Sequence, residues 1–160
     1  MGAVVETPAI YLNMSAEENL KLQCLSVGVP SYDSVPEILE LVGLAKTGRK
    51  KAGHFSLGMK QRLGIAMALV GNPDFLVLDE PVNGLDPQGI IELRELILKL
   101  NREYQITVLI SSHILDELSR LATHYGFVNE GRLVKEISAD ELENACKKCT
   151  RIEVTNTNAL

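Results

Sequence analysis

Long apolar runs are absent from this chain of 160 residues, and none approaches the roughly 18 residues that a membrane-spanning helix needs. The segment at Met1 has no basic region followed by an apolar stretch, so no signal peptide is expected. Blocks of basic residues are equally scarce: only Arg49-Lys50-Lys51 stands out, and the net charge is -5. We therefore expect no nucleic-acid partner and no direct membrane insertion, so that any membrane link runs through another protein.

Cysteine is rare, with only Cys24, Cys146 and Cys149. An odd number of cysteines indicates free thiols in a reducing compartment. Cys146 and Cys149 form a C-x-x-C pair, but a redox or zinc site would need a second pair or a strand–helix setting, and the sequence shows neither. We expect two ordinary thiols at the end of a surface helix.

The first third of the chain is predicted to be helical. Ser15-x-x-Glu18 and Ser34-x-x-Glu37 both match the capping box that starts a helix. The polar, glycine-bearing stretch from 43 to 53 is expected to be a loop. Apolar residues at helical spacing then predict a helix that stops at 71–73; they are Met59, Leu63, Ala66 or Met67, and Val70.

From Asp74 onward the pattern alternates between strands and helices. Phe75–Leu78 and Ile106–Ile110 are short and apolar, as expected of strands buried on both faces. Such alternation indicates an α/β fold with a parallel sheet, and the helical front section is predicted to be a separate lobe. The other expected elements are a helix from Asp86-Pro87, a helix through Ile114, Leu118 and Leu121, a hairpin around Asn129-Glu130-Gly131, a helix capped by Ser138-x-x-Glu141, and a strand at Arg151–Val154.

Two adjacent carboxylates, Asp79 and Glu80, follow the first apolar strand directly. A parallel strand projects its last residues into the ligand crevice, so Asp79 could hold Mg2+, which prefers oxygen ligands. Glu80 could polarise a water for in-line attack on a phosphate. The alternative is a solvated pair of acids. The turn Gly84–Pro87 and His113 after the second strand favour the phosphate site.

These motifs resemble the ATP-binding domain of ABC transporters. FLVLDEP is similar to the Walker B strand of that family, NGLDP to its D-loop, SSH to its switch histidine, and FSLGM at 55–59 to its signature loop. SLGMKQRLGIAMAL and SSHILDEL resemble in particular the bacitracin-resistance type of exporter ATPase. The resemblance implies a P-loop NTPase (RecA-like) parallel sheet with flanking helices plus an α-helical lobe. It divides the chain into a Q-loop segment at 1–12, a helical subdomain at 13–72 that ends in the signature helix, and the C-terminal part of the core at 73–160.

The resemblance also assigns roles at the signature loop. Ser56, Leu57 and Gly58 would lie at the amino end of a helix, where free amides and the helix dipole suit the γ-phosphate of ATP bound by an opposite subunit. Gly58 would let the backbone approach that phosphate closely. Met59 stands where the family has Gln, so a side-chain amide is lost. From the residues alone, Ser56 could equally be an ordinary helix cap.

Three further roles follow from the resemblance. Asp86 would couple two sites across a dimer, or could simply cap the helix that begins at Pro87. His113 would contact the γ-phosphate and hold the attacking water. Glu6 stands where the family's Q-loop has Gln; its carboxylate can still meet Mg2+, but it adds negative charge beside phosphate. The resemblance thus implies ATP and Mg2+ as ligands, with Asp79 and Glu6 at the metal.

The phosphate loop of this fold, G-x-x-x-x-G-K-[ST], is not found in the 160 residues. Gly43–Lys50 has the glycine spacing, but Arg49-Lys50 replaces Lys and Ser/Thr, and a helix-like segment precedes it. We therefore expect the chain to be a piece of a longer domain, with negligible ATPase activity alone. Apolar side chains of Phe75–Leu78 and Ile106–Ile110 should then be exposed, so that the chain self-associates or folds only in part.

The expected function is that of an ATP-hydrolysing subunit that energises export through a transmembrane permease, together with a second nucleotide-binding domain. Its expected location is the cytoplasmic face of the membrane. Two alternatives remain open: a soluble ABC-type ATPase that is not a transporter, and a non-catalytic remnant. The transported substrate cannot be read from the sequence.

Overall fold

The computed structural model describes residues 1–146. They form two compact units, Met1–Ile114 and a second unit that begins at Leu115, and each is described by itself. Within the described residues no helix is both long enough and apolar enough to span a membrane.

A three-stranded parallel sheet organises the first unit, in the order β1 (Gly2–Val5), β2 (Phe75–Asp79) and β3 (Thr107–Ser111). The predicted α/β fold with a parallel sheet is confirmed. Strand β1 was not expected, because the front of the chain was predicted to be helical. Four residues are too few to show a periodic pattern, and the strand depends on pairing with β2. It also needs Gly2, where a Cβ would lie 2.2 Å from the carbonyl oxygen of Ala68.

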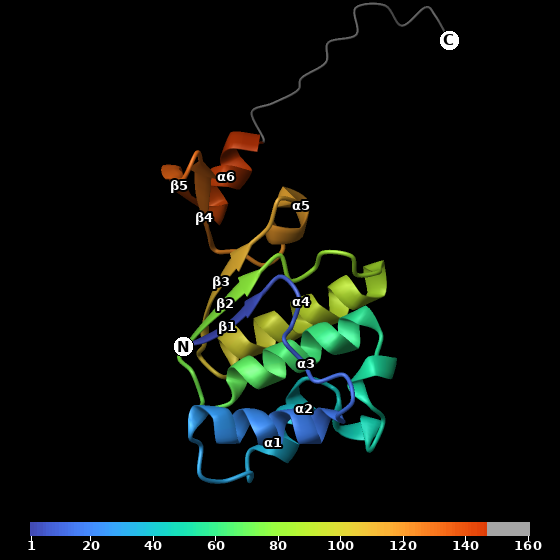
Figure 1. Cartoon of the computed structure of the whole chain (residues 1–160). Coiled ribbons are helices and arrows are strands. Elements are labelled where there is room, and N and C mark those ends of the chain that lie inside the picture. The colour runs from blue at the N-terminus through green and yellow to red at the C-terminus, as the bar shows by residue number, and fades with distance from the viewer. Residues whose placement is uncertain (147–160) are drawn as a thin grey trace, which may run out of the picture. The chain divides into compact units, whose positions relative to one another are not determined.

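Helices cover one face of this sheet. Figure 1 shows α3 and α4 running beside the strands, with α1 and α2 packed further out. The helices of the unit are α1 (Ala16–Val27), α2 (Val35–Leu41), α3 (Leu57–Leu69) and α4 (Pro87–Arg102), with short 3-10 turns at Ala45–Thr47 and Ala52–His54. The two 3-10 turns lie within the stretch that was expected to be a loop.

Burial alternates along β2 because only one face of the sheet is covered. Leu76 and Leu78 are fully buried, whereas Leu109 on β3 is 56% exposed and Val5 on β1 is 65% exposed. The expectation that β2 and β3 are buried on both faces is therefore wrong. The expected exposure of apolar side chains is confirmed for Leu109 but wrong for Leu76, Leu78 and Ile106, which pack beneath the helices.

The first capping box forms as predicted, and the second does not. Glu18 N–H donates to Ser15 Oγ at 3.2 Å, and Ser15 N–H donates to Glu18 Oε2 at 2.6 Å. Ser34 makes no such bond, because its backbone is already helical (φ -76, ψ -15) and the side chain does not turn back onto the helix.

The glycine-spaced segment Gly43–Lys50 follows helix α2 and carries a 3-10 turn. A phosphate loop instead connects a strand to a helix. The structure therefore confirms that this segment is not a phosphate loop.

The second unit contains α5 (Leu115–Leu118), the antiparallel pair β4 (His124–Asn129) and β5 (Arg132–Ser138), and α6 (Ala139–Cys146). The predicted hairpin is confirmed, and its turn residues Glu130 and Gly131 both have positive φ, 47° and 73°, as tight hairpins require. The predicted cap of α6 is also confirmed, since Glu141 N–H donates to Ser138 Oγ. Helix α5 is a single turn, so the expected helix through Leu121 is wrong. Cys149 and Arg151–Val154 lie outside the described residues.

Candidate functional site

The carboxyl ends of the three parallel strands bring the predicted acids to one edge of the sheet. Val5 pairs with Asp79, and Asp79 pairs with Ser111 on the other side. Glu6 and Glu80 therefore follow at the same level on neighbouring strands. Both have positive φ, 49° and 47°, which turns the chain sharply away from the sheet. Within the described residues no hydrogen bond joins the side chain of Glu6 to Asp79 or Glu80.

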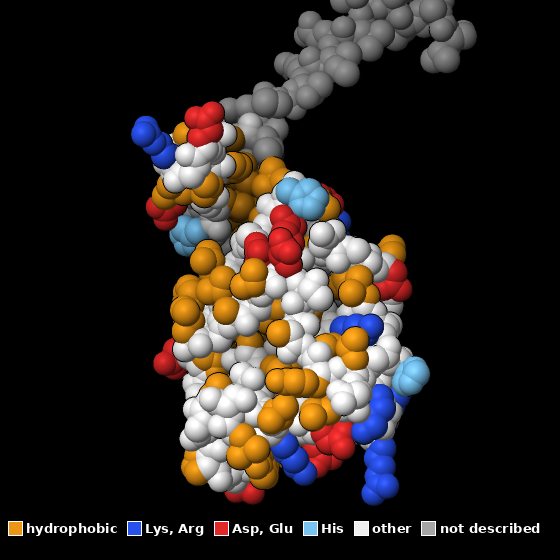
Figure 2. Space-filling model, viewed as in Figure 1, with side chains coloured by type: hydrophobic (Ala, Val, Ile, Leu, Met, Phe, Trp, Pro, Cys, Tyr) orange, Lys and Arg blue, Asp and Glu red, His pale blue; other side chains and the backbone are white. Residues whose placement is uncertain are grey.

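Glu80 and His113 are in direct contact at this edge. Nδ1 of His113 lies 3.0 Å from Oε1 and 2.9 Å from Oε2 of Glu80. The side chain of Glu80 is 26% exposed and that of His113 is 67% exposed. Figure 2 shows acidic side chains gathered next to a histidine on this face. A carboxylate next to an imidazole, both open to solvent, can hold a water molecule and take a proton from it.

Ser111 connects the two adjacent acids. Its Oγ accepts a hydrogen bond from Glu80 N–H at 3.0 Å and donates one to Asp79 Oδ1. Its carbonyl oxygen also accepts from Glu80 N–H, at 3.2 Å. Ser111 belongs to the SSH motif, but no pattern in the sequence assigned it a role. Its role could have been inferred only by pairing the two strands in parallel, which puts Ser111 opposite Asp79.

The signature residues lie at the amino end of α3, as predicted. Ser56 is the N-cap, and its Oγ accepts from Met59 N–H at 3.3 Å. Leu57 packs against the D-loop turn, since a Cβ at Gly84 would lie 3.2 Å from Leu57 Cδ2. At Gly58 the only contact that a Cβ would make among residues 1–146 is with Leu85 Cδ2, at 3.8 Å, so no described neighbour requires glycine there.

These signature residues are not joined to the acids. Within residues 1–146 no hydrogen bond or ion pair links positions 56–59 to Asp79, Glu80 or His113. Asp86 caps α4, because its Oδ1 accepts from Gly89 N–H at 2.9 Å. Its capping function is therefore confirmed. The dimer-coupling role of Asp86 and the phosphate-binding role of the signature turn stay predictions.

The donor set at the sheet edge fits a magnesium ion that completes its shell with phosphate and water. Among the described residues no group of three or more His, Cys, Asp or Glu side chains could enclose a metal. Mg2+ is commonly held by one or two carboxylates plus substrate phosphates; Asp79 ends β2, and Glu6 directly follows the adjacent strand β1. Asp79 is held in place through the Ser111 hydroxyl, which suits such a ligand.

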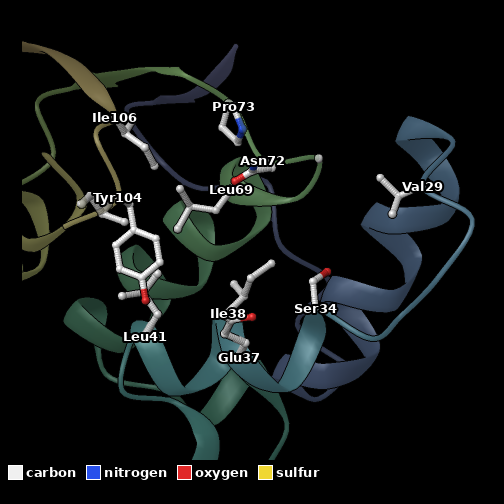
Figure 3. A pocket seen from close by; sticks show the side chains of 12 residues that line it. Val29, Ser34, Glu37, Ile38, Leu41, Leu69, Asn72, Pro73, Tyr104 and Ile106 are labelled. Atoms are coloured by element: carbon white, nitrogen blue, oxygen red, sulfur yellow. The ribbon is translucent and has the colours of Figure 1, made fainter.

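A separate cavity of about 350 Å3 lies between α2, the end of α3 and the chain before β3. In Figure 3 the side chains of Ile38, Leu69, Pro73 and Ile106 line it, with Tyr104 beside them. None of the predicted site residues borders this cavity, and its lining is mainly apolar. The acids and the histidine that could act on a phosphate therefore lie at the sheet edge and not in this cavity.

Helices packed on a parallel sheet, with acids at its carboxyl edge, fit the P-loop NTPase fold, in which ligands bind beyond the carboxyl ends of the strands. The solved structures most relevant here share this fold. The chain superposes with a TM-score of 0.81 at 26% identity on cbiO1 from Clostridium perfringens, part of the ABC transporter complex cbiONQ, covering 91% of this chain and 60% of that one. A dimeric post-hydrolysis state of the ATP-binding cassette MJ0796, bound to ADP and Pi, matches with a TM-score of 0.73 at 23% identity over 86% of this chain and 62% of that one.

The sequence profile described as ABC transporter matches residues 1–83, and the chain belongs to this family. It is 46% identical over 158 residues to the bacitracin transport ATP-binding protein BcrA of Bacillus licheniformis, covering 99% of this chain and 52% of that protein. The chain spans about half the length of the curated relatives it matches.

Proposed function

We propose that this chain supplies the water-activating acid and the signature turn of the ATP-hydrolysing subunit of an ABC exporter. The observation that supports this most is the contact of His113 with Glu80 immediately after Asp79, at the end of the central strand. An acid held by an imidazole beside a metal-type carboxylate is the arrangement that in-line attack of water on a phosphate requires.

The residues at the sheet edge divide the work. Glu80 orients the attacking water and takes its proton, and His113 holds the carboxylate in place and reaches the terminal phosphate. Asp79 and Glu6 would hold Mg2+. When bound, the ion neutralises the charge that builds up on the phosphate oxygens.

The signature turn serves a second site. Ser56, Leu57 and Gly58 present the amino end of α3, where free N–H groups and the helix dipole attract an anion. Because this turn is not joined to the chain's own acids, we propose that it meets ATP held by a second nucleotide-binding domain. Asp86, next to the turn that packs on Leu57, would couple the two sites.

The similarity to a bacitracin transport protein supports export of an antibiotic through a transmembrane permease. The subunit would then work at the cytoplasmic face of the membrane, attached through that permease.

The phosphate loop has to come from outside these 160 residues. Its backbone amides and lysine supply most of the charge neutralisation around ATP. We therefore propose that the chain alone turns over ATP negligibly. The segment 1–12 would act as a Q-loop segment, 13–72 as a helical subdomain and 73–160 as part of the catalytic core.

The test is to fuse the chain behind a strand, phosphate loop and helix taken from an ATP-binding protein of the same family. The fusion should hydrolyse Mg-ATP, the chain alone should not, and Glu80→Gln in the fusion should reduce kcat by at least about 100-fold while ATP still binds. Glu95→Gln on α4 is the matched control. Turnover by the chain alone, or full activity of the Glu80→Gln fusion, would contradict the proposal.

A further inference from the structure

We propose that Ser111 is a positioning residue of the hydrolytic site, whose hydroxyl holds the backbone of Glu80 so that its carboxylate meets His113. The inference rests on the proposed function for its catalytic meaning. The positioning itself is a property of this chain and can be tested without nucleotide.

The hydroxyl of Ser111 uses its donor and its acceptor at once. It accepts from Glu80 N–H at 3.0 Å and donates to the carboxylate of Asp79. Serine and threonine are the side chains of this size that can do both, whereas alanine can do neither. One small group therefore fixes the proposed metal ligand and the residue that carries the proposed general base.

Glu80 needs this support because of its backbone. Its φ of 47° lies in the left-handed region, which non-glycine residues occupy only when the surrounding structure holds them there. The single N–H of Glu80 is shared between the Oγ of Ser111 and the more distant carbonyl oxygen of the same residue, at 3.2 Å. Without the hydroxyl, the N–H of Glu80 keeps only the longer bond to the carbonyl oxygen of Ser111.

The tautomer of the His113 ring depends on the position of the Glu80 carboxylate. The bond from Nδ1 to the carboxylate requires the proton on Nδ1, because both carboxylate oxygens are acceptors. If Glu80 relaxes, the neutral ring is free to move its proton to Nε2. The tautomer of His113 therefore reports the placement of Glu80 in the folded chain.

The next residue provides a matched control. Ser112 also carries a hydroxyl on the same segment, but its Oγ accepts only from Ile114 N–H, at 3.1 Å, and touches neither acid. Removing the hydroxyl at 112 changes composition and polarity as much as removing it at 111. Both substitutions remove one hydroxyl, but the bonds lost at 112 do not include one to Asp79 or Glu80.

The experiment measures nitrogen-15 shifts of the His113 ring at alkaline pH, where imidazole is neutral, together with hydrogen exchange of the Glu80 amide, in the full 160-residue chain. We expect the Nδ1–H tautomer in the parent, Ser111→Thr and Ser112→Ala chains. In Ser111→Ala, the Nδ1–H population should fall at least two-fold and exchange at Glu80 should accelerate by about three- to ten-fold.

An unchanged tautomer and an unchanged Glu80 exchange rate in Ser111→Ala would overturn the proposal. So would a failure of Ser111→Thr to restore both, since packing rather than the hydroxyl would then be responsible. Ser111→Val, which has the shape of threonine without its hydroxyl, takes the place of Ser111→Ala if that chain does not fold, and parental shifts and exchange in it would equally overturn the proposal. Absence of ATP turnover in the fused protein would refute the proposed function and leave this result standing.

Discussion

Nδ1 of His113 lies 2.9 Å from Oε2 of Glu80, although 33 positions separate the two residues in the chain. Parallel pairing of β2 with β3 produces this contact, because both residues follow the carboxyl ends of adjacent strands. The contact exists within a chain whose 160 residues contain no phosphate loop. The contact therefore needs no residue of a phosphate loop.

Replacing His113 with alanine should remove the imidazole that holds Glu80. In the fused protein we expect kcat to fall by about 100-fold with little change in KM for ATP, because general-base chemistry of this kind contributes roughly that much. His54→Ala, in the 3-10 turn at Ala52–His54, is the control and should keep full activity. Equal losses in both variants would mean that His113 has no specific role.

Two glycines of α3 should respond oppositely to alanine. At Gly64 a Cβ would lie 2.5 Å from Pro8 Cβ, so Gly64→Ala should destabilise the chain by about 1–3 kcal/mol. At Gly58 the nearest atom is 3.8 Å away, and Gly58→Ala should leave stability equal or higher by up to about 1 kcal/mol. Urea unfolding measures both.

The same Gly58→Ala variant tests the proposed phosphate contact. If the backbone at Gly58 approaches phosphate on a second domain, the added methyl should lower the ATPase rate of the fused protein while the fold is intact. A stable variant with parental turnover would show that the signature turn does not approach the nucleotide.

The Walker B strand, the helix starts at Ser56 and Asp86, and the hairpin at Glu130-Gly131 could all be predicted from the sequence, because each depends on neighbouring residues. Apolar runs, caps and turn residues act within a few positions along the chain. The family resemblance placed Glu80 and His113 at one site, but their direct contact was not predicted and comes from the structure.

Other features could not be predicted because they depend on distant pairing. Strand β1 is stabilised by β2, more than 70 residues away. Ser111 gains its role only when Asp79 lies opposite in register. Ser34 carries the capping pattern, yet its backbone enters the helix one residue early, so the side chain has no cap to make. Burial on one face of the sheet also depends on which helices pack there.

Capping and coupling at Asp86 can be separated with two substitutions. Asp86→Ala removes the acceptor for Gly89 N–H and should destabilise the chain by about 1 kcal/mol. Asp86→Asn keeps a good cap, so stability should stay within about 0.5 kcal/mol. If Asp86 also couples two sites, the asparagine fused protein should still turn over more slowly than the parent. Parental turnover would leave capping as its whole function.

The stability of the folded chain at acidic pH should depend on Glu18. The N–H of Ser15, together with the Lys51 ammonium and the Ser15 hydroxyl, lowers the pKa of Glu18 from 4.5 to about 2. A lowered pKa in the folded state means that the unfolded chain binds the proton first as pH falls. The stabilisation by Glu18 is thus complete above pH 4.5 and is lost as pH falls toward 2.

Glu18→Gln should accordingly lower the melting temperature at pH 7 and have progressively less effect between pH 4.5 and pH 2. The exposed pair of Glu18 with Lys51, at 2.9 Å, contributes to the same dependence, so Lys51→Met should show a smaller version of it. Glu37→Gln serves as the control, because its serine forms no cap. A difference between parent and Glu18→Gln that stays constant across this range would mean that the carboxylate charge is not what stabilises the start of α1.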